Sequence, residues 1–153
     1  MKTSESARPV EETIRTLFRT QKLAVLSTHG SGQPYASLVA FVASEDLKHL
    51  YFATARTTRK FQNLDADPRV AMLMDSRSNL ESDIHGAVAV TATGSACEIT
   101  GREKDEGVRL YLSKHPYLQD FVQAESCALI KVSVQTFYLV SRFQQVMELH
   151  VQP

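Results

Sequence analysis

The stretch LYFATARTTRKFQNLDADPRVAMLM, residues 50–74, carries the signals that decide the fold. Its first five residues form a short apolar run with the composition of a β-strand. Phe61 and Leu64 then stand three positions apart behind Thr57 and Thr58, either of which can cap a helix, and Asp67-Pro68 ends that helix. Residues 70–74 are a second apolar run. The stretch therefore predicts a strand, a short helix and a second strand.

Other short strands surround this stretch at the spacing of an all-β sheet. Before it, residues 23–27 and 35–43 are typical of strands, and the turn-rich segment 29–34 separates them. Gly94 favours a bulge or a barrel bend in the strand that contains it. After the stretch we expect strands over residues 87–99, 128–140 and 143–149.

Helical spacing occurs at the N-terminal side and in one later region. Pro9 and the apolar residues that follow it predict a helix over roughly residues 9–20. Residues 103–112 and 116–122 predict two more helical pieces, whereas 76–86 reads as a polar loop. We therefore expect an α+β fold, mostly β, with a barrel-like sheet of about six to seven strands and short flanking helices.

Length and composition restrict the class of protein. The chain has 153 residues, which fits a single domain over residues 1–153. Its 17 Lys and Arg balance its 17 Asp and Glu, so net charge gives no reason to expect binding to nucleic acid or to an anionic membrane. Cys97 and Cys127 are too far apart for a CxxC motif and are expected to be buried thiols. No apolar run is long enough to span a membrane and the N-terminus is polar, so we expect a cytoplasmic protein.

Several motifs that carry chemistry in other proteins are absent from the sequence. Residues 30–32 read GSG, but the third glycine of a dinucleotide fingerprint is missing and the segment lies between predicted strands. The sequence has neither GxxxxGK[ST] nor GxSxG. Its five histidines have neither HxH nor HExxH spacing, so we expect no metal site.

A cluster of cations, Arg56, Arg59 and Lys60, lies at the start of the helix predicted in the opening stretch. Cations in the first turn oppose the helix dipole, and an anion bound there would remove that conflict. Free amides, a threonine hydroxyl and the basic side chains would together bind a phosphate monoester. From spacing alone, a solvated basic patch is an equal alternative.

Four segments in order resemble the pyridoxamine 5'-phosphate oxidase-like FMN-binding split-barrel superfamily. They are Gly32-Gln33-Pro34-Tyr35, Leu50-Tyr51-Phe52-Ala53-Thr54, Thr58-Arg59-Lys60 and Asp67-Pro68-Arg69-Val70-Ala71. The resemblance covers about residues 10–100 and, more weakly, the rest. It implies a Greek-key split barrel and a homodimer with FMN in clefts at the subunit interface. It also implies a flavin-dependent oxidoreductase that acts on a small molecule and receives hydride from a nicotinamide donor such as NAD(P)H.

The resemblance also assigns cofactor-binding residues. Arg59 and Lys60 would hold the FMN phosphate, with Thr58 at the family's usual serine position. The strand that begins at Ser37 would run along the isoalloxazine edge. Arg142 and Phe143 would either cover the partner's flavin or pack at the barrel edge. The predicted cofactor-binding residues are Ser37, Leu38, Val39, Ala40, Ala53, Thr54, Thr58, Arg59, Lys60, Arg142 and Phe143.

The sequence departs from the vitamin-B6 oxidase itself. Ser37 stands where that oxidase has arginine, the chain has no tryptophan, and residues 140–147 lack the oxidase's Arg-Leu-His-Asp-Arg segment. The ending is more similar to the flavin reductase-like and haem-utilisation-like branches. The alternatives are therefore a non-enzymatic flavin- or haem-binding storage or sensor protein, or a relative that uses deazaflavin. Asp83 and His85, in the polar loop, either reach a flavin or substrate or are solvated.

Two strand segments give a further reason to expect a dimer. Ala87–Val90 and Leu129–Val134 are more apolar than the surface of a monomer usually is. We therefore expect a second copy of the chain to cover them.

Overall fold

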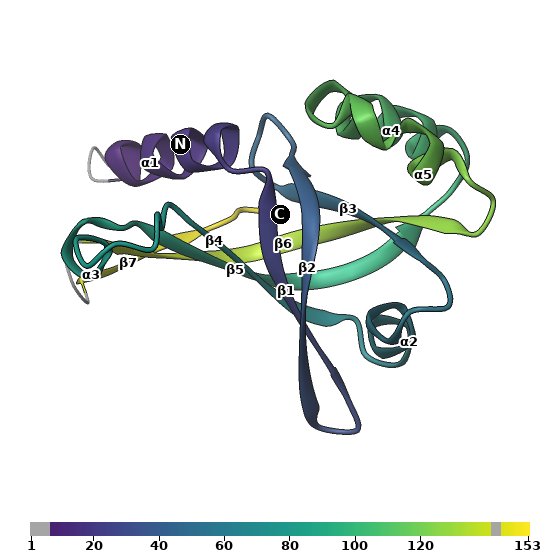
Figure 1. Cartoon of the computed structure of the whole chain (residues 1–153), viewed down its shortest axis with the longest axis horizontal. Helices are drawn as coiled ribbons and strands as arrows, with labels where there is room; N and C mark the ends of the chain where they lie inside the picture. Colours follow the sequence, from purple (N-terminus) through teal and green to yellow (C-terminus); the bar gives the residue numbers. More distant parts are fainter. Residues whose placement is uncertain (1–6, 142–144) are drawn as a thin grey trace.

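Six antiparallel strands close into a barrel, and a seventh extends the sheet (Figure 1). The structure is a computed structural model that describes residues 7–141 and 145–153. Strand order is β3-β2-β1-β4-β5-β6-β7, and β3 also pairs with β6, which closes the barrel. The neighbours β4-β1-β2-β3 form a Greek key, as expected. The strands are β1 (Leu23–Gly30), β2 (Gln33–Ala43), β3 (His49–Ala55), β4 (Arg69–Asp75), β5 (Ala89–Ile99), β6 (Cys127–Ser141) and β7 (Gln145–His150).

Short helices flank the barrel and confirm the predicted α+β class. The expected N-terminal helix begins two residues before Pro9, and the segment predicted as a loop contains one helical turn. In the described residues, no helix has both the length and the apolar character needed to cross a membrane. The helices are α1 (Ala7–Thr20), α2 (Arg59–Ala66), α3 (Asp83–Gly86), α4 (Gly101–Lys114), the 3-10 turn η1 (Pro116–Leu118) and α5 (Gln119–Gln123).

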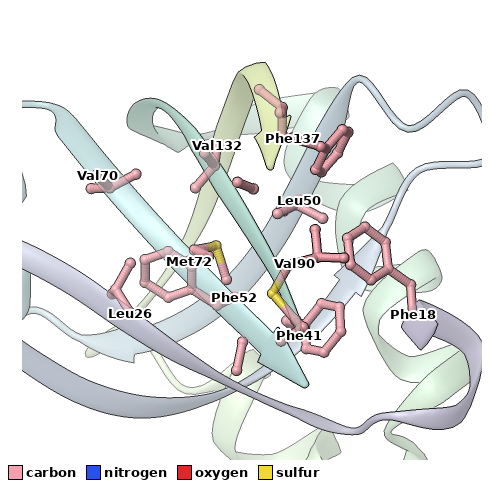
Figure 2. Close-up of a cluster of buried hydrophobic side chains, with 14 of the residues drawn as sticks. Phe18, Leu26, Phe41, Leu50, Phe52, Val70, Met72, Val90, Val132 and Phe137 are labelled. Atoms are coloured by element: carbon pink, nitrogen blue, oxygen red, sulfur yellow. The ribbon is translucent and has the colours of Figure 1, made fainter. Parts of the chain in front are cut away.

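The barrel interior is filled by large apolar side chains from all six of its strands (Figure 2). Helix α1 closes one side of this core with a buried face of Val10, Ile14, Leu17 and Phe18. The Phe18 ring meets Phe41 edge-on at 5.6 Å between centroids. The apolar periodicity of α1 is thus explained by packing, because four residues on one helix face contact the core.

Of the two apolar segments expected to need a partner, the large side chains of the second are buried within one chain. Leu129, Ile130 and Val132 are fully buried, and Val90 is also buried. Ile130, Val132 and Val90 pack in the barrel core, and Leu129 packs in a second cluster with residues of α4 and α5. These four residues therefore need no second copy to cover them, whereas Ala87, Val88 and Ala89 are half-buried. The dimer itself stays a prediction. The prediction for the cysteines was wrong at Cys97, which is exposed, and right at Cys127.

Glycine is required at two places in the barrel, the turn between β1 and β2 and the bulge in β5. Ser31 and Gly32 have φ values of 50° and 81°, which suits the two-residue turn between β1 and β2. The pairing of β5 with β6 shifts register between Thr93 and Gly94, which confirms the predicted bulge. A Cβ at Gly94 would lie 2.2 Å from the backbone oxygen of Ser133. Only glycine allows the two backbones to approach this closely.

We predict that Gly94→Ala lowers the free energy of unfolding by about 1–3 kcal/mol, because the methyl group forces β5 away from β6. Urea denaturation measures the change. Gly86→Ala is the control, since nothing lies within 4 Å of a Cβ there. The control should leave stability unchanged or raise it by about 0.4–1 kcal/mol. Equal stability of the Gly94→Ala variant and the wild type would show that the bulge does not require glycine.

Candidate cofactor-binding site

The N-terminus of α2 is capped by Thr58, not by its neighbour Thr57. Thr58 has extended backbone, and its hydroxyl accepts a hydrogen bond from the Phe61 amide at 3.3 Å. The same hydroxyl donates to the carbonyl of Ala55 at 2.9 Å and lies 2.8 Å from the hydroxyl of Thr54. Thr58 therefore joins the end of β3 to the start of α2, and it fixes the direction of the first helical turn.

Arg59 and Lys60 occupy the first two positions of α2, which has no acidic residue in its first turn. The Arg59 guanidinium lies 5.6 Å from the ring centroid of Tyr35 on β2. Among the residues that the structure describes, no carboxylate forms a salt bridge with either cation. Two positive charges thus stand uncompensated at the positive end of a helix dipole.

Arg56 does not belong to this pair, although the sequence suggested a cluster of three cations. Its guanidinium forms a salt bridge with Glu98 on β5 and donates to the carbonyl of Glu125 at 2.6 Å. The hydrogen bond to Glu98 raises the pKa of Arg56 above its ordinary value. Its charge is therefore balanced within the chain, and only Arg59 and Lys60 remain available to an anion.

β2 and β3 separate next to α2, and Tyr111 of α4 lies at the point of separation. Pairing between these strands ends at Phe41 and Phe52, one residue before Ala40 and Ala53. The Tyr111 hydroxyl donates to the carbonyl of Ala40 at 3.3 Å and accepts from the amide of Ala53. Burial raises the pKa of Tyr111, so this hydroxyl stays protonated. Beyond it, β2 turns into the long hairpin with β1, and β3 leads into α2 (Figure 1).

The predicted residues on β2 differ in how their side chains are placed. The Ser37 hydroxyl is buried and has no hydrogen-bond partner among the described residues. Leu38 is 62% exposed. Val39 packs in the barrel core, so only its backbone is available to a ligand. Ala40 is half-buried.

The predicted residues on β3 and α2 do come together. Ala53 and Thr54 are buried at the end of β3, and Thr54 reaches Thr58 through its hydroxyl. Arg59 also brings α2 to β2 through Tyr35. Arg142 and Phe143 lie outside the described residues.

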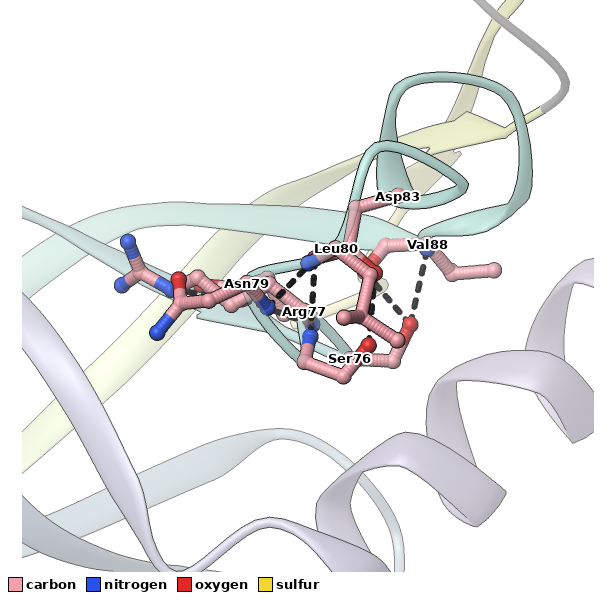
Figure 3. Close-up of polar contacts among 8 residues, drawn as sticks. Ser76, Arg77, Asn79, Leu80, Asp83 and Val88 are labelled. Carbon is pink, nitrogen blue, oxygen red and sulfur yellow. Dashed lines mark hydrogen bonds and ion pairs between the residues drawn. The ribbon is translucent and has the colours of Figure 1, made fainter.

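Asp83 holds together the loop that precedes α3 (Figure 3). One carboxylate oxygen accepts hydrogen bonds from the amides of Ser78, Asn79 and Leu80, at 2.8, 2.7 and 3.2 Å. Desolvation opposes ionisation, but these hydrogen bonds outweigh it and lower the pKa of Asp83. The carboxylate therefore closes the loop before α3. His85 lies within the same helical turn.

A second polar cluster lies beside the β1–β2 hairpin. Two of its residues, Asp67 and Arg69, belong to a motif quoted in the sequence analysis, which gave them no role. Asp67 forms a salt bridge with Arg69 at 2.7 Å, and the same carboxylate oxygen lies 2.9 Å from Nε2 of His29. Hydrogen bonds from Arg69 hold the pKa of Asp67 well below its usual range. His29 and Arg69 line a cleft of about 470 Å³ with Ser27 and Thr93, and none of the predicted cofactor residues lines it. In the described part of the chain, no group of three or more His, Cys, Asp or Glu could hold a metal ion.

A family model described as pyridoxamine 5'-phosphate oxidase matches residues 10–141, which include the barrel and α2. The chain belongs to this family. The match spans β1 to β6 and thus all the strands that close the barrel. Among proteins with curated descriptions, none matches the chain.

Solved structures share the fold of this pyridoxamine 5'-phosphate oxidase family member at low sequence identity. A haem-binding protein from Mycobacterium smegmatis has a TM-score of 0.81 and 17% identity over 98% of the chain. The chain spans only 59% of that protein's length. A FAD-binding protein from Mesorhizobium loti has a TM-score of 0.65 and 18% identity, covering 84% of this chain and 91% of its own. A putative pyridoxamine 5'-phosphate oxidase from Listeria innocua has a TM-score of 0.66 and 17% identity, and the match covers 86% of this chain and 98% of that protein.

We predict that Thr58→Ala lowers the free energy of unfolding by about 0.5–2 kcal/mol, because α2 loses its cap. Thr57→Ala is the matched control. Thr57 is exposed, so its loss should change stability by no more than about 0.5 kcal/mol. Urea denaturation of both variants measures the difference. The same cost in both variants would contradict the assignment of the cap to Thr58.

Proposed function

We propose that this protein binds FMN and acts as a flavin-dependent oxidoreductase on a small molecule. The observation that carries the proposal is the pair Arg59 and Lys60 at the capped N-terminus of α2, without a carboxylate partner among the described residues. Such a pair costs stability unless an anion binds between the cations and the helix amides. The phosphate monoester of FMN is an anion of the required size and charge.

The rest of the proposed site lies on β2 and at the end of β3. The isoalloxazine ring would lie along the β2 backbone between Ser37 and Ala40, with the ribityl chain passing Ala53 and Thr54. The unpartnered Ser37 hydroxyl supports this placement, because a buried polar group without a partner costs about 1–3 kcal/mol and a flavin would satisfy it. Family membership adds support, because the match includes all these residues.

Bound FMN would supply the redox chemistry by accepting hydride from a nicotinamide donor and passing it to an acceptor. The chain's own residues would bind and orient the cofactor. Tyr111 would keep β2 and β3 at a fixed separation beside it, because its hydroxyl binds both strands. No nucleophilic side chain is needed for this chemistry.

We predict that Arg59→Ala weakens FMN binding about tenfold to a hundredfold, because one charge-assisted hydrogen bond contributes roughly 1.5–3 kcal/mol. The double variant with Lys60→Ala should nearly abolish binding. Riboflavin, which lacks the phosphate, should bind the wild type far more weakly than FMN and should be almost insensitive to either substitution. Flavin fluorescence titration measures these affinities.

Arg102→Ala controls for the loss of one positive charge. Arg102 is highly exposed on α4, and its removal should change FMN affinity less than about twofold at physiological ionic strength. Equal binding of FMN and riboflavin to the wild type would refute the phosphate assignment. Unchanged FMN affinity in Arg59→Ala would do the same.

Haem binding for storage or sensing is the second candidate function. The haem-binding protein from Mycobacterium smegmatis has the same fold, and the two haem propionates are anions that Arg59 and Lys60 could also bind. The absorption spectrum of the purified protein and identification of its released chromophore distinguish haem, FMN and deazaflavin.

We predict that the FMN-loaded protein is reduced by NADH or NADPH under anaerobic conditions and is reoxidised by air or an acceptor. Absorbance at the flavin band follows both steps. Reduction by dithionite but by neither nicotinamide would contradict the proposed donor. In that case the storage or sensor function becomes the better proposal.

We further propose a homodimer that is formed through the outer face of β1, β2 and β4. Val25 on β1 pairs with Leu38 on β2 and with Leu73 on β4, so the three form one row across the sheet. They line a shallow depression of about 260 Å³ together with Leu23, which is half exposed. A second copy would cover this row and bring its own residues next to the FMN site beside Leu38.

We predict a mass of twice 17.1 kDa for the wild type by light scattering. Leu38→Glu should shift the protein to the monomer, because a buried unpaired charge opposes association. Ile84→Glu is the control, because Ile84 has the same 62% exposure but lies on α3. A wild-type mass near 17 kDa at full FMN occupancy would contradict the interfacial site.

A further inference from the structure

A separate cavity is lined by residues of α1, α4 and the C-terminal end of β2. This end of β2 is distant from α2 (Figure 1). Its volume is about 330 Å³. None of the residues assigned to FMN lines it, so a ligand bound here is independent of the proposed function. Its lining residues are Arg15, Phe18, Arg19, Val42, Ala43, Ser44, Leu47, Ser113 and Lys114.

The lining combines an apolar surface with positive charge. Phe18, Val42 and Leu47 are buried residues of the core. Arg19 and Lys114 form no salt bridge with any carboxylate that the structure describes. None of the described lining residues is acidic. A cavity with this lining attracts an anion that also has an apolar part.

Arg15 is the one cation of the cavity whose charge is balanced by a described carboxylate. It forms an i,i+4 salt bridge with Glu11 at 2.7 Å and donates to the backbone carbonyl of Glu45. Asp46, on the adjacent turn, is also occupied: it accepts hydrogen bonds from the Ser44 hydroxyl at 2.6 Å and from the Lys48 amide at 3.0 Å. The carboxylates of Glu11 and Asp46 are therefore bound to these partners and do not neutralise Arg19 or Lys114.

The ammonium group of Lys114 is partly buried in largely apolar surroundings. Its ammonium lies 3.9 Å from the centroid of the Phe41 ring and donates to the carbonyl of Phe18 at 2.7 Å. That carbonyl belongs to the last turn of α1, so the contact also caps the helix. Burial lowers the pKa of Lys114 to about 8. The carbonyl and the ring only partly compensate the lost hydration, and a bound carboxylate would complete the compensation.

We propose that this cavity binds a small amphipathic carboxylate. The carboxylate lies at Lys114 and Arg19, and the hydrocarbon part packs against Phe18, Val42 and Leu47. The volume equals that of about eleven liquid water molecules, which suits a ligand of about ten non-hydrogen atoms. A medium-chain fatty acid or an aromatic carboxylic acid has this size.

Octanoate and 1-octanol are suitable probes, because they share a chain length and differ in charge. The test uses protein labelled with ¹³C in its lysine side chains, and NMR follows the titration of Lys114. Saturating octanoate should raise the pKa of Lys114 by about one unit or more, since a nearby opposite charge favours the ammonium. 1-Octanol should leave that pKa unchanged and should bind at least about tenfold more weakly.

Substitutions locate the site independently of the NMR signal. Lys114→Met and Arg19→Ala should each weaken octanoate binding about tenfold or more in calorimetric titrations. Lys104→Met on α4 and Arg8→Ala on α1 are the matched controls, because neither residue lines the cavity. Both controls should bind octanoate with wild-type affinity.

Three results would overturn the proposal. They are octanoate binding no tighter than 1-octanol, an unchanged Lys114 pKa at saturating octanoate, and equal losses in the variants and their controls. If Lys114→Met does not fold, the wild-type titration and Arg19→Ala decide the question.

Discussion

The architecture depends on one strand, β6, that hydrogen-bonds to three others. Along one edge it pairs with β5 from Leu129 to Val140. Along the other edge it pairs first with β3, up to Ser133, and then with β7 from Thr136 onward. The barrel closes only over the first half of β6, and the change of partner occurs beside the bulge at Gly94. Closure fixes the end of β3, and the end of β3 positions α2 with its two cations.

The sequence was sufficient to predict features that depend on local interactions. The helix after β3, its capping threonine, the bulge at Gly94 and the turn at Ser31–Gly32 each depend on residues within a few positions of one another. Features that depend on distant residues were not predictable in this way. Arg56 looked equivalent to Arg59 until the fold brought Glu98 to it from 42 positions away. Likewise, the apolar run Leu129–Val134 does not reveal that Leu129 packs against residues of α4 and α5.

The cations of this protein have three different kinds of surroundings. Arg56 is neutralised by a carboxylate, and Lys114 is stabilised by a carbonyl and an aromatic ring. Arg59 and Lys60 have only a distant ring and the unfavourable end of a helix dipole. Desolvation and the helix dipole both make an uncompensated cation costly, which is the physical basis for proposing an anion beside Arg59 and Lys60. The net charge of zero conceals this local imbalance.

The large separation of β6 from β3 along the sequence has a consequence for synthesis on the ribosome. When α4 has emerged, the edges of β3 and β5 are both complete but have no strand between them. The residues of β6 lie about 70 or more positions after their partners on β3, so the nascent chain must keep these apolar strands apart from other chains for several seconds. The long helical insertion between β5 and β6 extends this interval. Pairing over this distance in sequence favours slow folding, and it leaves the edges of β3 and β5 open to other chains until β6 has been made.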